Sequence, residues 1–200
     1  MEKNRLLLRG KMSTPLYFSH ELYGEKFYNF FIEIERLSGV MDTVEVQVSE
    51  RLLCAESFDE GDFVEVKGQL RSYNQFISES KSRLKIYGFA KEIKKIEEET
   101  YTNEISLKGF LCKDPVYRTT PFDRKISDLL IAVNTTNYRS DYIPCIVWGR
   151  NAIYIEQFAV GTGVELKGRI QSRKYNKLLE NGECEQRIAY ELSCNLLEIM

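Results

Sequence analysis

The segment Ser140–Arg150 holds the only tryptophan of the chain, Trp148, two residues before an arginine. Its sequence, SDYIPCIVWGR, alternates as a β-strand does, and neighbouring side chains of a strand point to opposite faces. One face would carry the core-like residues Ile143, Cys145 and Val147. The other would carry Tyr142, Pro144, Ile146 and Trp148. Because the outer face of a half-buried strand is normally polar, this second apolar face must be covered by protein or by a ligand.

No catalytic signature accompanies these aromatic residues. The sequence contains no HExxH, GxSxG, Walker or GxGxxG motif, and it has a single histidine. The five cysteines are widely spaced without a CxxC pair, which favours reduced thiols over a zinc site or a disulfide framework. We therefore expect a protein that is not an enzyme and that requires no metal or other cofactor.

The composition allows one large core or two small ones, since the chain has 200 residues and 43% hydrophobic content. A net charge of -2 gives no global positive field, so any basic groove must be local. The sequence has no apolar run of about 18 residues. The opening residues, MEKNRLLLRGKM, are too charged for a signal peptide. These features predict a cytoplasmic protein with no membrane partner.

An internal repeat with an offset of 99 or 100 residues organises the chain. The segment GDFVEVKGQLRS (Gly61–Ser72) matches GTGVELKGRIQS (Gly161–Ser172). Similarly, NRLLLRGKM (Asn4–Met12) matches NEISLKGFL (Asn103–Leu111), and a charged connector separates the two copies. We therefore predict two domains, residues 1–97 and residues 102–200.

Each copy predicts a strand, a loop, two more strands, a short helix and two long strands. The helix is predicted at Ser49–Phe58 in the first copy and at Gly149–Phe158 in the second. Five strands with one helix between the third and fourth form the pattern of an OB fold, a small closed barrel. The strand interiors contain glycines that suit the bends of a closed barrel, namely Gly10, Gly68, Gly109 and Gly168. The predicted fold class is all-β, with two tandem five-stranded OB-fold barrels.

The second copy resembles the bacterial single-stranded DNA-binding proteins over almost all of residues 103–199. The resemblance rests on five blocks in the same order: ISLKGFLCKDPVYRTTP, LLIAVN, SDYIPCIVWGRNA, GVELKGRIQSRKYNK and RIAYELS. The first copy, with FSHELYGEKFYNFFIEI, SERLL and GQLRSYN, resembles the amino-terminal partner domain of a tandem clostridial branch of that family.

The resemblance implies an OB fold whose aromatic side chains stack on unpaired bases, while lysines and arginines follow the phosphates. The residues implied to stack are Trp148, Tyr142, Tyr175 and Tyr138. Those implied to contact phosphates are Arg150, Arg169, Arg173, Lys174 and Lys177, with Arg118 and Arg124 as weaker candidates. Physical chemistry supports this arrangement, because any base offers a π-face and stacking contributes about 1–3 kcal/mol per base.

The first copy departs from this pattern. In place of Tyr138, Tyr142 and Trp148 it has Gly39, Thr43 and Ser49, whereas Arg51 matches Arg150. Its remaining aromatic candidates are Tyr73 and Phe76 beside the position of Tyr175, and Phe27 and Phe31 on the second strand. The first barrel therefore either binds a strand by a displaced path or forms a subunit interface. We favour weak or altered strand binding.

The sequence thus predicts sequence-tolerant binding of single-stranded DNA in replication, recombination or repair. The alternative is a replication-associated scaffold that holds protein on the same apolar strand face, with secondary nucleic-acid binding. Family members present four barrels per assembly, which implies a homodimer of this chain. After LSCNLLEIM (Leu192–Met200) we find none of the acidic-tipped tail that most family members carry, so we expect no recruitment of other proteins through such a tail.

Overall fold

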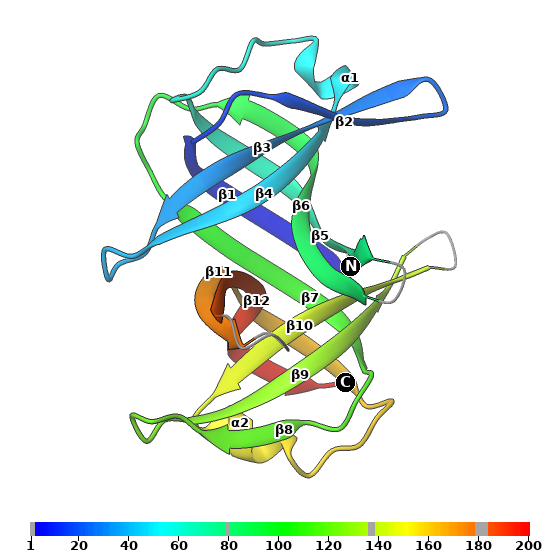
Figure 1. The fold of residues 1–200 in the computed structure, drawn as a ribbon, viewed down its shortest axis with the longest axis vertical. Coiled ribbons are helices and arrows are strands. Elements are labelled where there is room, and N and C mark those ends of the chain that lie inside the picture. Colours follow the sequence, from blue (N-terminus) through cyan, green and yellow to red (C-terminus); the bar gives the residue numbers. More distant parts are fainter. Residues whose placement is uncertain (1–2, 79–80, 136–138, 179–183) are drawn as a thin grey trace.

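The computed structural model describes residues 3–78, 81–135, 139–178 and 184–200, which form two β-barrels, one above the other (Figure 1). The first barrel contains β1 (Asn4–Met12), β2 (Tyr17–Leu22), β3 (Glu25–Glu35), β4 (Met41–Ser49), α1 (Glu50–Leu53), β5 (Phe63–Ser78) and β6 (Lys81–Lys95). The second contains β7 (Thr102–Leu111), β8 (Val116–Thr119), β9 (Lys125–Asn134), β10 (Ser140–Trp148), α2 (Arg150–Ile155), β11 (Gly163–Leu178) and β12 (Cys184–Ile199).

Both barrels close in the same way. In the first, β1 pairs with both β3 and β5, and a short parallel ladder between β4 and β6 completes the ring. In the second, β7 pairs with both β9 and β11, and β10 pairs in parallel with β12. The prediction of two tandem five-stranded barrels, each with a short helix after the third barrel strand, is confirmed.

Two local predictions differ from the structure. The helices are shorter than predicted, because the chain leaves α1 after Leu53 and continues as a loop that buries Phe58. In addition, β2 and β8 form hairpins with β3 and β9 where loops were expected. The β2–β3 hairpin turns at Tyr23 and Gly24, which both have positive φ angles, as its tight turn requires. Neither helix of the described chain has the length and apolar character that a membrane span requires.

The strand alternation builds one apolar interior in each barrel. Phe30, Ile32 and Val46 are fully buried in the first barrel, as are Ile143 and Val147 in the second. Their neighbours on the same strands are less buried, as the alternation predicted, except Ile146, which is only 3% exposed. The interior face of β10 is therefore as predicted, and its outer face keeps accessible surface at Tyr142 and Trp148.

Two equivalent glycines allow the last two strands to pack closely at matching bulges. The pairing shifts register between Lys67 and Gly68 and between Lys167 and Gly168. A Cβ atom at Gly168 would collide with the backbone oxygen of Ser193, and one at Gly68 would collide with that of Phe89. A side chain is therefore excluded at both positions, in agreement with the predicted role of these glycines in closure.

The barrels are joined by an antiparallel ladder between β1 and β7. Leu6 pairs with Ile105, its own equivalent in the repeat, so the junction has an approximate two-fold axis at this pair. Asn4 and Asn103 reinforce the ladder on each side. The side chain of Asn4 exchanges two hydrogen bonds with the backbone of Leu70, and that of Asn103 does the same with Ile170.

A second pair of contacts crosses the junction in both directions. The backbone N–H of Ser172 donates to Asp42 Oδ1 at 2.9 Å, and that of Ser72 donates to Asp141 Oδ1 at 2.8 Å. Both aspartates are buried, and each also accepts from an arginine, Arg36 on Asp42 and Arg71 on Asp141. Buried carboxylates with charged partners fix geometry strongly, since leaving one partner unpaired is costly.

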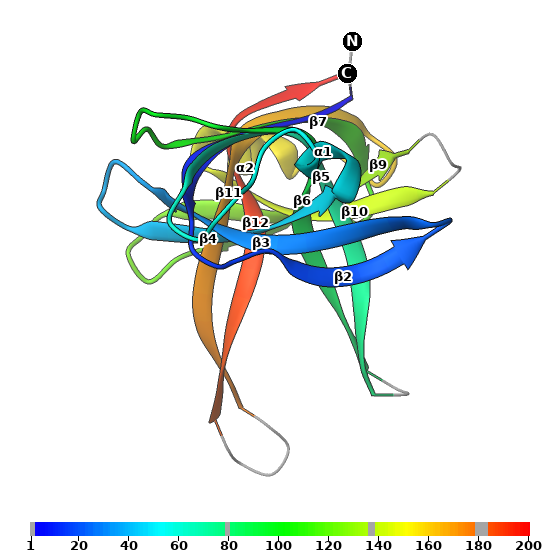
Figure 2. The same ribbon diagram turned by 90° about the horizontal axis from the view of Figure 1, so that it is seen from above.

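Two long hairpins extend from the barrels on the same side of the molecule (Figure 2). They are formed by β5 with β6 and by β11 with β12. Arg83 of the first hairpin donates through Nη2 to the backbone oxygen of Ile188 of the second at 2.6 Å. The hairpins thus add a further contact between the two barrels.

We expect Asp42→Ala to lower the free energy of unfolding by about 2 kcal/mol or more, because it removes an acceptor from Ser172 and leaves the Arg36 guanidinium without its partner. Urea denaturation followed by circular dichroism measures this change. The control is Glu92→Ala, whose side chain is 71% exposed and which should change stability by less than about 0.5 kcal/mol. Equal effects of the two substitutions would contradict the role of Asp42 at the junction.

Candidate nucleic-acid interface

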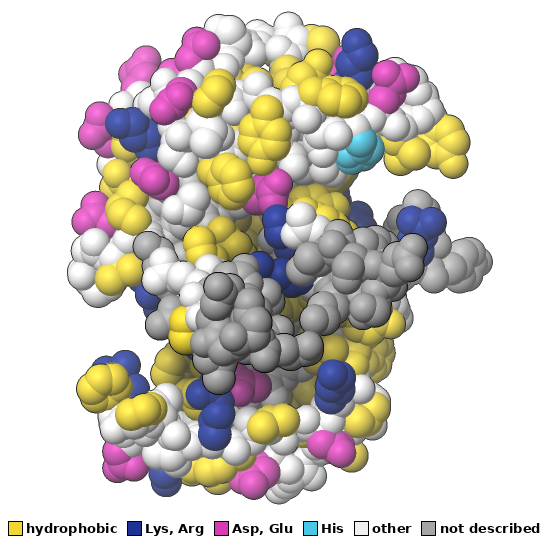
Figure 3. Space-filling model, viewed as in Figure 1, with side chains coloured by type: hydrophobic (Ala, Val, Ile, Leu, Met, Phe, Trp, Pro, Cys, Tyr) yellow, Lys and Arg dark blue, Asp and Glu magenta, His cyan; other side chains and the backbone are white. Residues whose placement is uncertain are grey.

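An open cavity of about 680 Å³ lies beside Trp148 at the junction of the two barrels. We call it the Trp148 groove. Its charged lining residues among those described are Arg36, Arg124, Arg169, Arg173 and Glu104. Four arginines against one glutamate make the groove locally positive, although the chain as a whole carries a net charge of -2. In Figure 3, Lys and Arg side chains gather in the hollow between the barrels.

Trp148 is held at the last position of β10. Its backbone pairs with Ile126 of β9, and its indole Nε1–H donates to Ser193 Oγ of β12 at 3.0 Å. This hydrogen bond satisfies the polar edge of the ring and fixes its orientation. The side chain is half-buried and lines the groove, so it keeps some accessible surface there.

The arginines of the groove come from two strand connections and one strand. Arg169 and Arg173 are exposed on β11, and Arg124 is exposed just before β9. Arg173 also lies 4.0 Å from Glu191. Guanidinium groups grouped in this way suit phosphate oxygens, which they bind through paired N–H donors.

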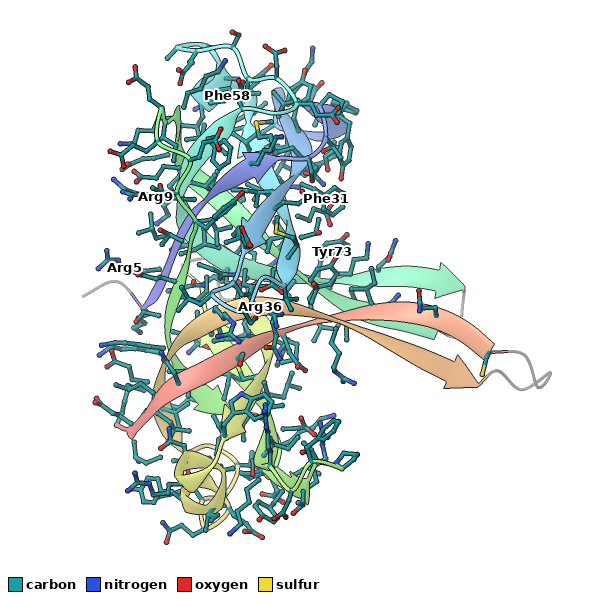
Figure 4. All side chains as sticks on the ribbon, turned by 90° about the vertical axis from the view of Figure 1, so that its left-hand side faces the viewer. Arg5, Arg9, Phe31, Arg36, Phe58 and Tyr73 are labelled. Carbon is teal, nitrogen blue, oxygen red and sulfur yellow. The ribbon has the colours of Figure 1, made fainter. Side chains whose placement is uncertain are left out.

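Arg36 reaches the groove from the first barrel, where it follows β3 (Figure 4). Its Nε and Nη2 atoms donate to the two oxygens of Asp42 at 2.6 and 2.5 Å. These hydrogen bonds raise the pKa of the guanidinium, which therefore stays charged. A guanidinium has five N–H donors, so three of them remain for another acceptor.

The structure brings Trp148, Arg169 and Arg173 together, as the resemblance implied, but places Tyr142 elsewhere. Tyr142 lies six positions earlier on β10, about 20 Å away along the strand. Its side chain is 45% exposed, and its backbone N–H donates to Ser72 Oγ of the first barrel at 2.8 Å. Arg150, the first residue of α2, is exposed and does not line the groove.

The other candidates divide into two sets. Tyr138 lies outside the described residues, and so do the side chains of Lys174, Tyr175 and Lys177, whose backbone belongs to β11. Of the two weaker candidates, Arg124 lines the groove. Arg118 instead pairs with Asp128 through Nε at 2.6 Å and Nη2 at 3.1 Å, which occupies its guanidinium.

The outer face of β10 is only partly covered by the protein itself. Ile146 is 3% exposed, between Asp128 on β9 and Ser193 on β12. Tyr142 and Trp148, at the two ends of this face, keep accessible surface. The second apolar face predicted from the sequence is thus sealed in the middle and open at both ends.

Sequence reasoning missed Arg36 and Ser193. Arg36 belongs to the other repeat, so nothing near Trp148 in the sequence indicates that it shares the groove. Ser193 lies 45 residues after Trp148, and the parallel pairing of β10 with β12 brings it to the indole.

The first barrel has the same register but a different set of side chains. Ser49 pairs with Phe27 as Trp148 pairs with Ile126, so the alignment of the copies is correct at this strand. Ser49 is buried and caps α1, accepting a hydrogen bond from the N–H of Arg51 at 3.2 Å. At the positions of Arg124, Arg169 and Arg173 the first barrel has Glu25, Gln69 and Tyr73. It therefore lacks the ring and these cations of the Trp148 groove.

Comparison with known proteins agrees with this geometry. Residues 102–200 match the model of the Single-strand binding protein family. Single-stranded DNA-binding protein 1 of Staphylococcus aureus is 32% identical over 105 residues, covering 49% of this chain and 60% of that protein. Single-stranded DNA-binding protein A of Bacillus subtilis is 34% identical over 80 residues, covering 36% of this chain and 46% of that protein. The carboxyl-terminal half of the chain belongs to the single-strand binding protein family.

A comparison with solved structures finds a similar fold over both barrels. The crystal structure of the wild-type single-stranded DNA binding protein from Thermus aquaticus aligns with a TM-score of 0.76, covering 98% of this chain and 92% of that chain at 20% identity. The chain spans less than two thirds of the length of the staphylococcal and Bacillus members of the family. The names of these relatives describe binding and no reaction, which agrees with the expectation that the chain is not an enzyme.

Because four arginines surround Trp148, we expect iodide to quench its fluorescence more efficiently than caesium does. The difference should shrink with added sodium chloride, since the screening length falls from about 10 Å at 0.1 M to about 3 Å at 1 M salt. The double variant Arg169→Gln, Arg173→Gln should lose most of the difference, and Lys26→Gln on the first barrel should keep it. Stern–Volmer constants provide the measurement. Equal constants for both ions in the unchanged protein would contradict the positive charge assigned to the groove.

Proposed function

We propose that the chain binds single-stranded DNA with little sequence preference and that the Trp148 groove is its principal site. The observation that carries this proposal is the sharing of one open groove by a half-buried tryptophan and four arginines. A flat ring accepts the π-face of any base, and guanidinium groups bind phosphates, which every nucleotide carries. This combination needs no pattern of base-edge hydrogen bonds.

The family membership of residues 102–200 supports the same substrate. The relatives are named for binding single-stranded DNA. We propose the same binding function for this chain, in DNA replication, recombination or repair. Proteins of this type keep an unpaired strand accessible and need no catalytic group, in keeping with the lack of an enzyme motif in the sequence.

The bound strand would extend beyond the groove. Tyr142, at the far end of the outer face of β10, offers a second exposed ring. Lys174, Tyr175 and Lys177 belong to the protruding β11 hairpin, so they would add a further stacking position and phosphate contacts. Arg150 and Tyr138 complete this proposed path as peripheral contacts.

The two barrels would contribute unequally. The first barrel has no counterpart of Trp148 and has Glu25, Gln69 and Tyr73 where the second has arginines. A strand placed on the first barrel in the same way would therefore meet fewer positive charges and no ring at the Ser49 position. We infer that the first barrel contributes to DNA binding mainly through Arg36.

Titration with oligo-dT should quench the single tryptophan, and the affinity should fall steeply with salt. Four arginine contacts to phosphates predict a slope of about -3 in a plot of log K against log salt concentration, at about -0.7 per neutralised phosphate. An unchanged Trp148 signal at micromolar DNA would overturn the proposal. Strong quenching without salt dependence would show that the arginines do not contact phosphates.

Trp148→Ala should weaken binding of labelled oligo-dT by roughly 5- to 150-fold, the equivalent of one stacked base. Thr43→Ala, at the equivalent of Tyr142 in the first barrel, should change the affinity by less than about twofold. Fluorescence anisotropy of the labelled strand measures both without relying on tryptophan. Equal losses would contradict the asymmetry between the barrels.

We further propose that two chains associate, since the resemblance to the family implies four barrels per assembly. Light scattering of the purified protein should then give twice the 23.4 kDa mass of one chain. Adding oligo-dT should leave two chains per particle. A mass of one chain at micromolar concentration would reject the homodimer and leave the Trp148 groove unaffected.

A further inference from the structure

The first barrel carries a glutamate in the middle of its outer face. Glu45 lies on β4 directly opposite Phe31 of β3. On the other side, β4 and β6 form a short parallel ladder. It pairs Val46 with Gly88 and Gln47 with Phe89, and Glu45 and Tyr87 are the next residues before it. An aromatic side chain therefore flanks the carboxylate on each neighbouring strand. Figure 3 shows hydrophobic side chains over much of the front of this barrel.

Two donors orient the carboxylate from neighbouring strands. Tyr17 of β2 donates through its hydroxyl to Glu45 Oε1 at 3.2 Å, and Asn29 of β3 donates through Nδ2 to the same oxygen at 2.8 Å. The Tyr17 ring also stacks on Phe31, with 6.4 Å between ring centroids. Within the described part of the chain, no lysine or arginine pairs with Glu45. Among the described residues, Glu45 is thus held by hydrogen-bond donors and by no ion pair.

Further tyrosines line the angle between this face and the protruding β5–β6 hairpin. The rings of Tyr73 and Tyr87 make an edge contact with centroids 5.6 Å apart, and Tyr73 is 41% exposed. Figure 4 shows Phe31 and Tyr73 on the side toward which the hairpin extends. We call Tyr17, Phe31, Glu45, Tyr73 and Tyr87 the Glu45 face.

The negative charge of Glu45 contributes to raised pKa values of nearby tyrosine hydroxyls. Burial, followed by the charge of Glu45, raises the pKa of Tyr17 to about 12. Burial raises the pKa of Tyr87 to about 12, with Asp141 and then Glu45 among the contributing charges. The pKa of Tyr73 is raised by burial and then by Glu45. The charge of Glu45 thus adds to the effect of burial on the pKa of all three tyrosines.

Two described arginines of the first barrel, Arg71 and Arg51, have partners other than Glu45. Arg71 pairs with Asp141 of the second barrel at 3.3 Å and lies over the Phe89 ring at 5.7 Å. Arg51 pairs with Glu25 at 3.2 Å. Neither of these two arginines therefore pairs with Glu45.

The equivalent face of the second barrel lacks this arrangement. There Pro144 stands at the position of Glu45, opposite Leu130 instead of Phe31. The glutamate of that face, Glu191, accepts from Gln171 at 2.8 Å and lies 4.0 Å from Arg173. Among the described residues at these equivalent positions, a carboxylate that lies between aromatic residues without a cationic partner occurs in the first barrel and not in the second.

We propose that the Glu45 face binds an arginine or lysine side chain of a partner protein. The carboxylate supplies an ion pair, and the faces of tyrosine and phenylalanine rings attract a cation through their π-electrons. Tyrosine-rich surfaces are also enriched at protein interfaces. The same negative charge repels the phosphates of a nucleic acid, so this site and the Trp148 groove would select ligands of opposite charge.

The test uses the full chain labelled with ¹⁵N and the peptide acetyl-Gly-Arg-Gly-amide as the probe. Saturable shifts should appear in the side-chain amide signals of Asn29 and Gln47, which border Glu45. A matched peptide with neutral citrulline in place of arginine should cause none. No saturable shift, or equal shifts with the two peptides, would overturn the proposal.

Variants separate the carboxylate from the rings. Glu45→Gln should weaken binding of the arginine peptide by about fivefold or more, and Tyr73→Leu, which keeps an apolar side chain, should also weaken it. Glu92→Gln, on the exposed part of β6, should leave it unchanged. Unaltered affinity in Glu45→Gln would reject the site.

Oligo-dT provides the last comparison. It should quench Trp148 equally in Glu45→Gln and in the unchanged chain, and it should not compete with the peptide. Competition, together with shifts of the Asn29 and Gln47 signals by DNA alone, would show that the Glu45 face binds nucleic acid and would overturn the proposal. Because peptide binding is measured without DNA, its outcome is independent of the function proposed for the Trp148 groove.

Discussion

The pairing of β1 with β7 fixes the two barrels relative to each other, and the Trp148 groove depends on that constraint. One wall of the groove, Arg36, belongs to the first barrel, while the ring and the other three arginines belong to the second. Asp42 binds both the Arg36 guanidinium and the N–H of Ser172, so one buried carboxylate sets the position of the cation and of β11. The groove can therefore be no more rigid than the junction that Asp42 stabilises.

The two barrels share a backbone arrangement but carry different side chains on their outer faces. Their registers coincide at β10 and β4, yet Trp148 lines an open groove and its counterpart, Ser49, is a buried helix cap. At the centre of the same face the second barrel has Pro144 and the first has Glu45. Function on this fold resides in outward side chains, which the closed barrel and its apolar interior leave free to vary.

The features that could be predicted from the sequence are those that depend on local periodicity or on the internal repeat. Alternation and the 99-residue offset predicted the barrels, the closing glycines and the outward position of Trp148, because each depends on local periodicity or on the repeat itself. Arg36 could not be predicted, since its place in the groove arises from docking between barrels. The β2 and β8 hairpins were missed because their short strands alternate weakly and depend on pairing with β3 and β9.

Joining two barrels in one chain removes a restriction that a symmetric pair of single barrels must obey. In a two-fold homodimer every substitution appears on both faces, so a charge that suits one ligand is imposed on both sites. Here the junction keeps its approximate two-fold form, with Leu6 opposite Ile105 and reciprocal aspartate contacts. The faces have nevertheless diverged to a positive groove at Trp148 and a negative site at Glu45. A covalent link thus keeps the junction intact while the two barrels carry different charges on their outer faces.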